Sequence, residues 1–451
     1  MIWRIAFSLF ICCFLLTDEF AWAESRGVFH PKTFTLENGL QVVVITNPRV
    51  PIVSQTIFYK VGGMDDPDGK SGMAHFLEHL MFEGESAVPA GKFSEVISRL
   101  GGNQNAATSR DLTYYYQHVP KTQLERVIQL EAGRMSKLTI SPKHVDVERK
   151  VVLEERRMRI DNKPGAILGE ATMNTFFWHH PYGRPVIGWE HEIETYTLED
   201  AQNFYQTWYV PNNAIAVYAG DITVEEVRPL VQKHFGKISK GASLPRVKNL
   251  QEPQHRGVAQ RVVLQSPLVE HAKFERLYPA PNLLTDGKKP YAIQVLSFIL
   301  GGGGATSYLY NALVHEQKIA SWVGVAYDPD SRGPSVFLVA AQPTPGNKIK
   351  TLERAIDTVL SDFLSGVLTE KDVSDAKRRM LAGLDYEKDP AFAGAREIGS
   401  VLAMGLTIDD VEMWPDRIKA VTLKQVQQVA QEILKNPQHV TAILLPTKKV
   451  Q

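Results

Sequence analysis

Apolar and polar residues alternate along several short stretches of the chain, and each stretch predicts a β-strand. The segment TFTLENGLQVVVITNP, from Thr33, places an Asn-Gly pair between two alternating runs and therefore predicts a hairpin. The segments PIVSQTIFYKVGG, from Pro51, and DLTYYYQHVP, from Asp111, predict further strands. Longer amphipathic stretches, from about Lys121 to Lys137 and from Pro142 to Arg159, predict helices.

A shorter helix is predicted in SGMAHFLEHLMFEG, with Ser71 as its N-cap. Positions i, i+3 and i+4 of a helix lie on one face, so His75, Glu78 and His79 point the same way. Two imidazoles four residues apart can bind one cation, and a carboxylate beside them can reach a water on that cation. Taken alone, this motif is equally compatible with a surface helix that carries two chance histidines.

The pattern of the first half of the chain recurs in the second half. SPKHVDVERKVVLEERRM, from Ser141, resembles TEKDVSDAKRRMLAGLDY, from Thr369, and YTLEDAQNFYQ, from Tyr196, resembles VTLKQVQQVAQ, from Val421. The spacing between partners is similar without being equal, as loop insertions between duplicated halves would make it. We therefore expect two homologous domains of mixed strands and helices, residues 24–236 and 258–451, joined by a polar linker over residues 237–257.

The second copy lacks the polar groups of the first. Its residues opposite Glu148 and Glu155 are Ala376 and Gly383. The residues opposite the two histidines and Glu78 are Ile293, Ser297 and Leu296. Residues that merely decorated the fold would have little reason to disappear together, so we expect the first half alone to carry their chemistry.

A catalytic zinc site takes three protein ligands and keeps one position for water. Beside the two histidines, the segment VERKVVLEERRMR offers Glu148, Glu154 and Glu155 as the third. On a helix, Glu148 and Glu155 are nearly eclipsed, whereas Glu154 is turned away by about 100°. Glu155 as the ligand, with Glu148 orienting a histidine, is a coherent arrangement. Without the histidines, the same glutamates would indicate a charged, solvated helix surface.

Composition sets limits on the class of protein. The chain has 451 residues, of which 44% are hydrophobic and 22% charged, as in a soluble globular protein with more than one domain. Lys and Arg together number 50, as do Asp and Glu, so the formal net charge is zero. This balance gives no indication of a nucleic-acid partner or of a polybasic membrane patch.

The first 23 residues have the layout of a secretory signal peptide. They contain Arg4, an apolar run from Ile5 to Leu16, and the cleavage-site pattern Ala21-Trp22-Ala23. Both cysteines lie inside this segment, so the mature chain would contain no disulfide. We expect a periplasmic or secreted protein without stable membrane insertion after signal cleavage, because no other apolar run reaches spanning length.

Together these motifs resemble the pitrilysin and mitochondrial-processing-peptidase family of inverted-zincin (HxxEH) metallopeptidases. The matching segments follow in order: HFLEH, GGNQNAATSRDLTYYYQHVP, ERKVVLEE, HPYGRPVIG, FYQTWYVPNNAIAVYAGD and LGGGGATSYLYNAL. The resemblance implies an α+β fold of two homologous domains, each an antiparallel sheet packed with helices, forming half of a clam-shell peptidase. It also implies a Zn²⁺ ion, although the residues themselves do not distinguish zinc from manganese or cobalt.

The resemblance assigns a role to each candidate residue. The implied zinc ligands are His75, His79 and Glu155, supported by Glu148, and the implied catalytic base is Glu78. The implied substrate contacts, on a sheet edge that would bind peptide as an added strand, are Asn105, Ala106 and Thr108. A simple polar turn before the tyrosine-rich strand is an equally good interpretation of those three.

The function implied is a zinc-dependent endopeptidase that hydrolyses unfolded peptides or small proteins. Many active members carry an arginine and a tyrosine in the second domain, where this chain has Val314 and Ser321. Neither side chain supplies the charge or the phenol, as in the zinc-bearing chain of bacterial two-subunit members. We therefore expect the catalytic subunit of a heterodimer, whose homologous partner supplies the Arg/Tyr pair. The alternatives are a non-catalytic scaffold subunit, disfavoured by the intact metal motif, and a mitochondrial presequence peptidase, disfavoured by the acidic residues of the leader.

Overall fold

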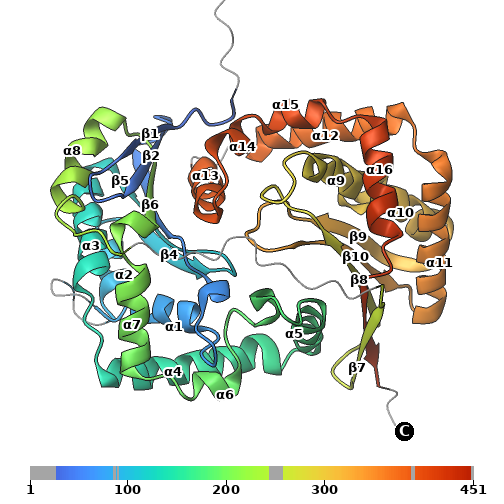
Figure 1. The fold of residues 1–451 in the computed structure, drawn as a ribbon, viewed down its shortest axis with the longest axis horizontal. Helices are drawn as coiled ribbons and strands as arrows, with labels where there is room; N and C mark the ends of the chain where they lie inside the picture. The colour runs from blue at the N-terminus through green and yellow to red at the C-terminus, as the bar shows by residue number, and fades with distance from the viewer. Residues whose placement is uncertain (1–26, 85–87, 89–90, 243–256, 388–391, 448–451) are drawn as a thin grey trace, which may run out of the picture.

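The computed structural model describes residues 27–84, 88, 91–242, 257–387 and 392–447. The predicted signal peptide and most of the predicted linker lie outside these residues. The described chain forms two sheets, each covered by helices, and the two halves lie side by side (Figure 1).

The first half contains a six-stranded sheet of order β1-β2-β6-β3-β5-β4. Its strands are β1 (Lys32–Thr35), β2 (Gln41–Thr46), β3 (Ile52–Tyr59), β4 (Asn103–Thr108), β5 (Thr113–Pro120) and β6 (Ala214–Gly220). The predicted hairpin is formed by β1 and β2, which Gly39 joins in a turn at φ +90°. All neighbouring strands are antiparallel except β2 and β6. Strand β4 lies at the edge.

The second half contains a five-stranded sheet of order β7-β11-β8-β10-β9. Its strands are β7 (Gln260–Ser266), β8 (Lys273–Ala280), β9 (Ala320–Tyr327), β10 (Ser335–Pro343) and β11 (Val440–Pro446). Taken in chain order, these five strands repeat the arrangement of β2 to β6, including the single parallel pair, here β7 and β11. The two-domain α+β fold is thus confirmed, with one parallel pair in each otherwise antiparallel sheet.

The helices of the first half surround its sheet and lead to the candidate site. They are α1 (Met73–Leu80), α2 (Phe93–Arg99), α3 (Leu124–Lys137), α4 (Pro142–Arg156), α5 (Pro164–Phe176), α6 (Glu190–Ile193), α7 (Leu198–Trp208) and α8 (Val224–His234). The apolar faces of α1, α3, α7 and α8 form one core with the inner face of the sheet.

The helices of the second half follow the same plan. They are α9 (Lys289–Ser297), α10 (Tyr308–Tyr310), α11 (Ile349–Asp362), α12 (Glu370–Glu387), α13 (Ala393–Met404), α14 (Ile408–Glu412), α15 (Trp414–Lys419) and α16 (Leu423–Leu434). The sequence repeats fall on matching helices, α4 with α12 and α7 with α16.

The two halves exchange one helix each. Helix α13 lies on the outer face of the first sheet, where Ile398 joins a core with Val43 and Val217 (Figure 1). Gly399 permits this close approach, because a Cβ atom there would overlap the ring of Phe58. In return, α5 packs its Leu168 against Ala442 and Leu444 of β11. Each sheet is therefore completed by a helix from the other half.

Within the part of the chain that the structure describes, none of the helices combines the length and the apolar character needed to cross a membrane.

Candidate metal centre

Helix α1 begins with an unusual cap. Gly72 takes the left-handed conformation, with φ +88°, and a Cβ there would lie 2.5 Å from the carbonyl oxygen of Ile187. The Asp66 carboxylate accepts hydrogen bonds from the N–H of Gly72 at 2.7 Å and of Ala74 at 2.8 Å. The predicted Ser71 cap is therefore wrong: its Oγ accepts from the N–H of Trp189 at 3.0 Å instead.

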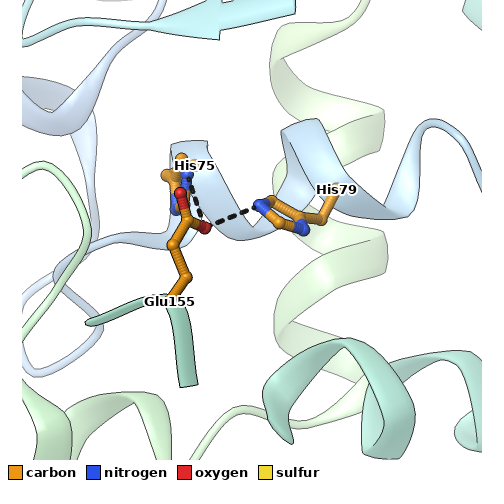
Figure 2. Close-up of side chains that lie close together, drawn as sticks. All are labelled: His75, His79 and Glu155. Carbon is orange, nitrogen blue, oxygen red and sulfur yellow. Dashed lines mark ion pairs between the residues drawn. The ribbon is translucent and has the colours of Figure 1, made fainter. Parts of the chain in front are cut away.

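The two histidines of α1 and Glu155 of α4 converge (Figure 2). Glu155 Oε2 lies 3.6 Å from Nε2 of His75 and 3.2 Å from Nε2 of His79. Two donors on one tetrahedral zinc ion would be about 3.4 Å apart. Glu155 Oε2 is also buried without a well-formed hydrogen bond. Two imidazoles, one carboxylate and an orphaned buried oxygen fit a dication that keeps an open position for water.

The charges of this cluster are strongly perturbed. Burial opposes a charge on His79, but its contacts with the Glu148 and Glu155 carboxylates outweigh it and raise its pKa to about 9. Burial, with the charge of His79, lowers the pKa of His75 to about 4. The adjacent His79 ring lowers the pKa of Glu155. A metal ion bound here would displace the proton of His79, because only an unprotonated imidazole nitrogen can bind a metal.

Glu148 lies behind His79, as the helical spacing predicted. Its Oε2 is 3.0 Å from Nδ1 of His79, so the ring can donate at Nδ1 and leave Nε2 free to bind a metal. Glu154 is 59% exposed and pairs with Arg157 at 3.3 Å, away from the histidines. Of the two adjacent glutamates, the structure thus brings Glu155 to the site.

Glu78 faces the edge strand β4. Thr108 Oγ1 donates a hydrogen bond to Glu78 Oε2 at 2.5 Å. Burial raises the pKa of Glu78, although this hydrogen bond lowers it. A carboxylate with a raised pKa, held beside a candidate metal centre, is suited to take and return a proton.

The three predicted substrate contacts all lie on β4, but on different faces. Ala106 and Thr108 share the face toward α1, whereas Asn105 points to the opposite face, above Tyr116 of β5. The N–H of Ser109 bonds the carbonyl of Leu112 at the hairpin end.

In an antiparallel pair, residues that lie opposite each other alternate between hydrogen-bonded and non-hydrogen-bonded pairs. The bond between Ser109 and Leu112 therefore determines which residues of β4 are hydrogen-bonded to β5. The backbone of Thr108, Ala106 and Gln104 therefore faces the open edge. In agreement, the N–H of Ala106 bonds the side chain of Asn105 at 2.9 Å rather than β5. Within the described residues, this side of β4 has no neighbouring strand.

One neighbour of the cluster was missed in the sequence. Arg159 pairs with Glu155 Oε1 at 2.9 Å. The spacing of four residues between acid and base was a signal for this pair, but the ordinary amphipathic pattern gave no reason to single it out.

The second half presents no Arg/Tyr pair at the two positions singled out. Val314 packs against the hydrophobic core of the second half. Ser321 on β9 donates a hydrogen bond to the carbonyl of Gln342 at 3.3 Å. Both side chains thus serve local structure.

Comparisons with known proteins identify the family. A family model described as "Insulinase (Peptidase family M16)" matches residues 41–190, and one described as "Peptidase M16 inactive domain" matches residues 195–380. The zinc protease PqqE of Helicobacter pylori is 31% identical over 424 residues, which cover 92% of this chain and 93% of that protein.

Two solved structures share the fold. The crystal structure of a protease from Helicobacter pylori matches with a TM-score of 0.85 at 29% identity, covering 92% of this chain and 99% of that one. The crystal structure of pitrilysin matches with a TM-score of 0.75 at 18% identity. That match covers 93% of this chain but 45% of pitrilysin, so the fold described here corresponds to about half of the longer molecule.

Proposed function

The chain belongs to the M16 peptidase family, and from this premise we propose that it is a zinc-dependent endopeptidase acting on unfolded peptides or small proteins. The observation that carries the proposal is the convergence of His75, His79 and Glu155 around one point. Relatives along nearly the whole chain are named zinc proteases, which supports zinc as the metal.

Each residue of the site has a task in peptide hydrolysis. His75, His79 and Glu155 would hold the zinc ion, which when bound makes water more acidic and polarises a carbonyl group. Glu78 takes the proton of the attacking water and returns it to the leaving amine. Thr108 holds the Glu78 carboxylate in place, and Glu148 fixes the tautomer of His79.

The substrate would bind to β4 as an added strand. The backbone groups of Gln104 and Thr108 and the carbonyl of Ala106 offer hydrogen bonds that do not depend on the peptide's sequence, and a peptide would displace the Asn105 side chain from the N–H of Ala106. Because Thr108 also contacts Glu78, a peptide paired with this edge passes directly beside the proposed base. Unfolded segments can adopt this extended form, whereas folded proteins cannot.

We further propose that the chain works as the catalytic subunit of a heterodimer in an exported compartment. The match to about half of pitrilysin leaves room for a second homologous subunit. Val314 and Ser321 stand where many active relatives have an arginine and a tyrosine, which the partner would supply. The signal-like first 23 residues support export to the periplasm.

A peptide-library digest tests these proposals. The purified mature chain is assayed alone and with a candidate homologous partner, before and after treatment with a chelator and after zinc is restored. We expect weak cleavage by the chain alone, stronger cleavage with the partner, and loss of both on chelation. Full turnover by the single chain would contradict the heterodimer. Absence of chelator-sensitive cleavage in every arm would favour a scaffold subunit.

A further inference from the structure

The helix that carries Glu155 changes its winding directly after that residue. Helix α4 ends at Arg156, and residues Arg157–Asp161 form a π-helical turn, in which the N–H of Asn162 bonds the carbonyl of Arg157. Such wider turns are rare and are frequent at functional sites. Three arginines lie within four positions where α4 meets this turn, Arg156, Arg157 and Arg159, and they have different surroundings.

Two of these arginines are engaged away from the open side of the site. Arg156 is buried, bonds both oxygens of Glu170 at 2.9 Å and donates to the carbonyl of Gly188. Arg157 is exposed and pairs with Glu154, which points away from the histidines. Arg156 therefore stabilises the packing of α4 against α5, and Arg157 makes only an ion pair at the surface.

Arg159 lies at the rim of the candidate metal centre. Its Nη1 atom pairs with Glu155 Oε1 at 2.9 Å, while Oε2 of the same carboxylate faces the histidines. The Arg159 side chain is 69% exposed, whereas Glu155 is 13% exposed. The guanidinium therefore covers the outer oxygen of the proposed ligand and faces outward itself.

The charge of Arg159 also acts on the proposed base. Burial raises the pKa of Glu78, and the charge of Arg159 opposes this rise slightly, so the guanidinium lies within electrostatic reach of the Glu78 carboxylate. A guanidinium has five N–H donors in a planar fork that matches a carboxylate. The described residues give Arg159 one ion pair, through one terminal nitrogen, so further donors are available to a ligand beside Glu78.

We propose that Arg159 determines specificity by receiving a carboxylate of the bound peptide close to the scissile bond. The carboxylate would belong to an Asp or Glu side chain or to the C-terminus of the peptide. This inference rests on the proposed peptidase function and extends it from peptides in general to peptides with an acidic group near the cleavage point.

A cation at the rim favours an acidic substrate, because the proposed base is itself a carboxylate. Glu155 would be neutralised by the bound metal ion, but the Glu78 carboxylate beside it would repel a nearby carboxylate of the peptide. The guanidinium at the rim reverses that repulsion where the peptide enters. As an exposed ion pair between residues four apart on a helix, Arg159 contributes little to folding stability, so its removal leaves the fold intact.

Matched peptides test the inference. Pairs that differ only by Glu or Gln at each position flanking the cleavage site, and pairs with a free or amidated C-terminus, distinguish the two sources of the carboxylate. The enzymes compared are the wild type, Arg159→Ala, Arg159→Lys and the control Arg157→Ala. We expect the wild type to prefer the acidic member at one position or at the C-terminus.

The variants should separate charge from geometry. We expect Arg159→Ala to lower kcat/KM for the acidic peptide about tenfold and to leave that of its neutral partner nearly unchanged. Arg159→Lys should keep part of the preference, since it retains the charge without the fork. Arg157→Ala should behave as the wild type. The preference should weaken as ionic strength increases.

Two measurements do not depend on turnover. Zinc content per chain should be the same in Arg159→Ala and the wild type. Binding of the peptide pairs to a Glu78→Gln chain, with and without Arg159→Ala, should show the same preference for the acidic member and its loss.

Several outcomes would overturn the inference. One is equal treatment of acidic and neutral peptides by the wild type, and another is an equal fall for both peptides in Arg159→Ala. A loss of zinc from Arg159→Ala would instead make Arg159 a residue that positions Glu155. If no peptide is cleaved at all, the proposed function fails, and the binding comparison alone still decides the role of Arg159.

Discussion

Glu78 lies on a helix where its neighbours Leu77 and Leu80 are fully buried, so a carboxylate at this position is unfavourable for folding. Burial raises its pKa, and Thr108 holds its carboxylate toward the edge strand. A titratable group kept in such surroundings, one position before the proposed metal ligand His79, indicates chemistry rather than stability.

Replacing Glu78 by Gln tests this role because it keeps the shape and removes the base. We expect zinc content to be unchanged and kcat to fall by about 100-fold or more, the usual contribution of a general base. Elemental analysis of the purified variant and a peptide assay are sufficient. Zinc lost from the variant, or activity retained, would contradict the assignment.

The adjacent pair Glu154 and Glu155 provides a matched comparison. Glu155→Ala should weaken zinc binding by more than about 100-fold, because even residues that only orient a ligand contribute up to that factor. Glu154→Ala should bind zinc as the wild type does, since its carboxylate points to Arg157. Zinc content after dialysis measures both. Loss of zinc from Glu154→Ala, with zinc retained in Glu155→Ala, would show that Glu154 is the third ligand.

Much of this site could be predicted from residue spacing. Helical geometry alone puts His75, Glu78 and His79 on one face, and the eclipsed positions of Glu148 and Glu155 favour their roles. The hydrogen bond from Thr108 to Glu78 could not be predicted, because it joins a helix to a strand that only the folded sheet brings together.

At the scale of elements, the start of α1 shows where local rules fail. Cap preferences consider the residue just before a helix, which pointed to Ser71. In the structure, a left-handed Gly72 turns the chain, and Asp66 supplies the acceptors from six residues earlier. The parallel pairing of β2 with β6 was not predicted for a similar reason. The two strands are far apart in the sequence, and no local pattern indicates that they pair or in which direction.

Asp66 therefore connects the loop before α1 to the position of both histidines. Asp66→Ala should remove two hydrogen bonds to the helix start and destabilise the fold by about 1–2 kcal/mol. We also expect weaker zinc binding, because α1 is less firmly fixed. Thermal unfolding and zinc titration test both effects. The control is Asp68→Ala, an exposed neighbour that faces Arg184 at 3.6 Å. Equal behaviour of the two variants would contradict this role.

At the scale of the whole molecule, the second half has none of the metal-ligating residues at the matching positions, yet it supports the site. Tyr182 donates to Asp111 at 2.5 Å, at the tip of the β4–β5 hairpin, and accepts from the N–H of Gly333 at 2.8 Å. The loop between β9 and β10 thus reaches the hairpin that carries the proposed substrate edge. The sequence repeat predicted the duplication, but not this contact or the exchange of α5 and α13, which only the packed halves determine.

The buried ion pair between Arg332 and Asp65, at 2.7 Å, tests how firmly the halves depend on each other. Both side chains are at most 7% exposed, so removing one partner leaves the other charge buried and unpaired. We expect Arg332→Ala to destabilise the protein by about 3–5 kcal/mol. Asp65 directly precedes the residue that caps α1, so zinc binding should weaken as well.

A double variant distinguishes loss of the pair from loss of a contact. Arg332→Met combined with Asp65→Leu removes both charges and keeps apolar volume, so it should be more stable than Arg332→Ala. Denaturant unfolding of the three proteins gives the comparison. If the single variant unfolds as the wild type does, the pair does not hold the halves together. If the double variant is the least stable of the three, an unpaired buried charge is not what destabilises Arg332→Ala. The two side chains would then stabilise the protein through their shape and hydrogen bonds.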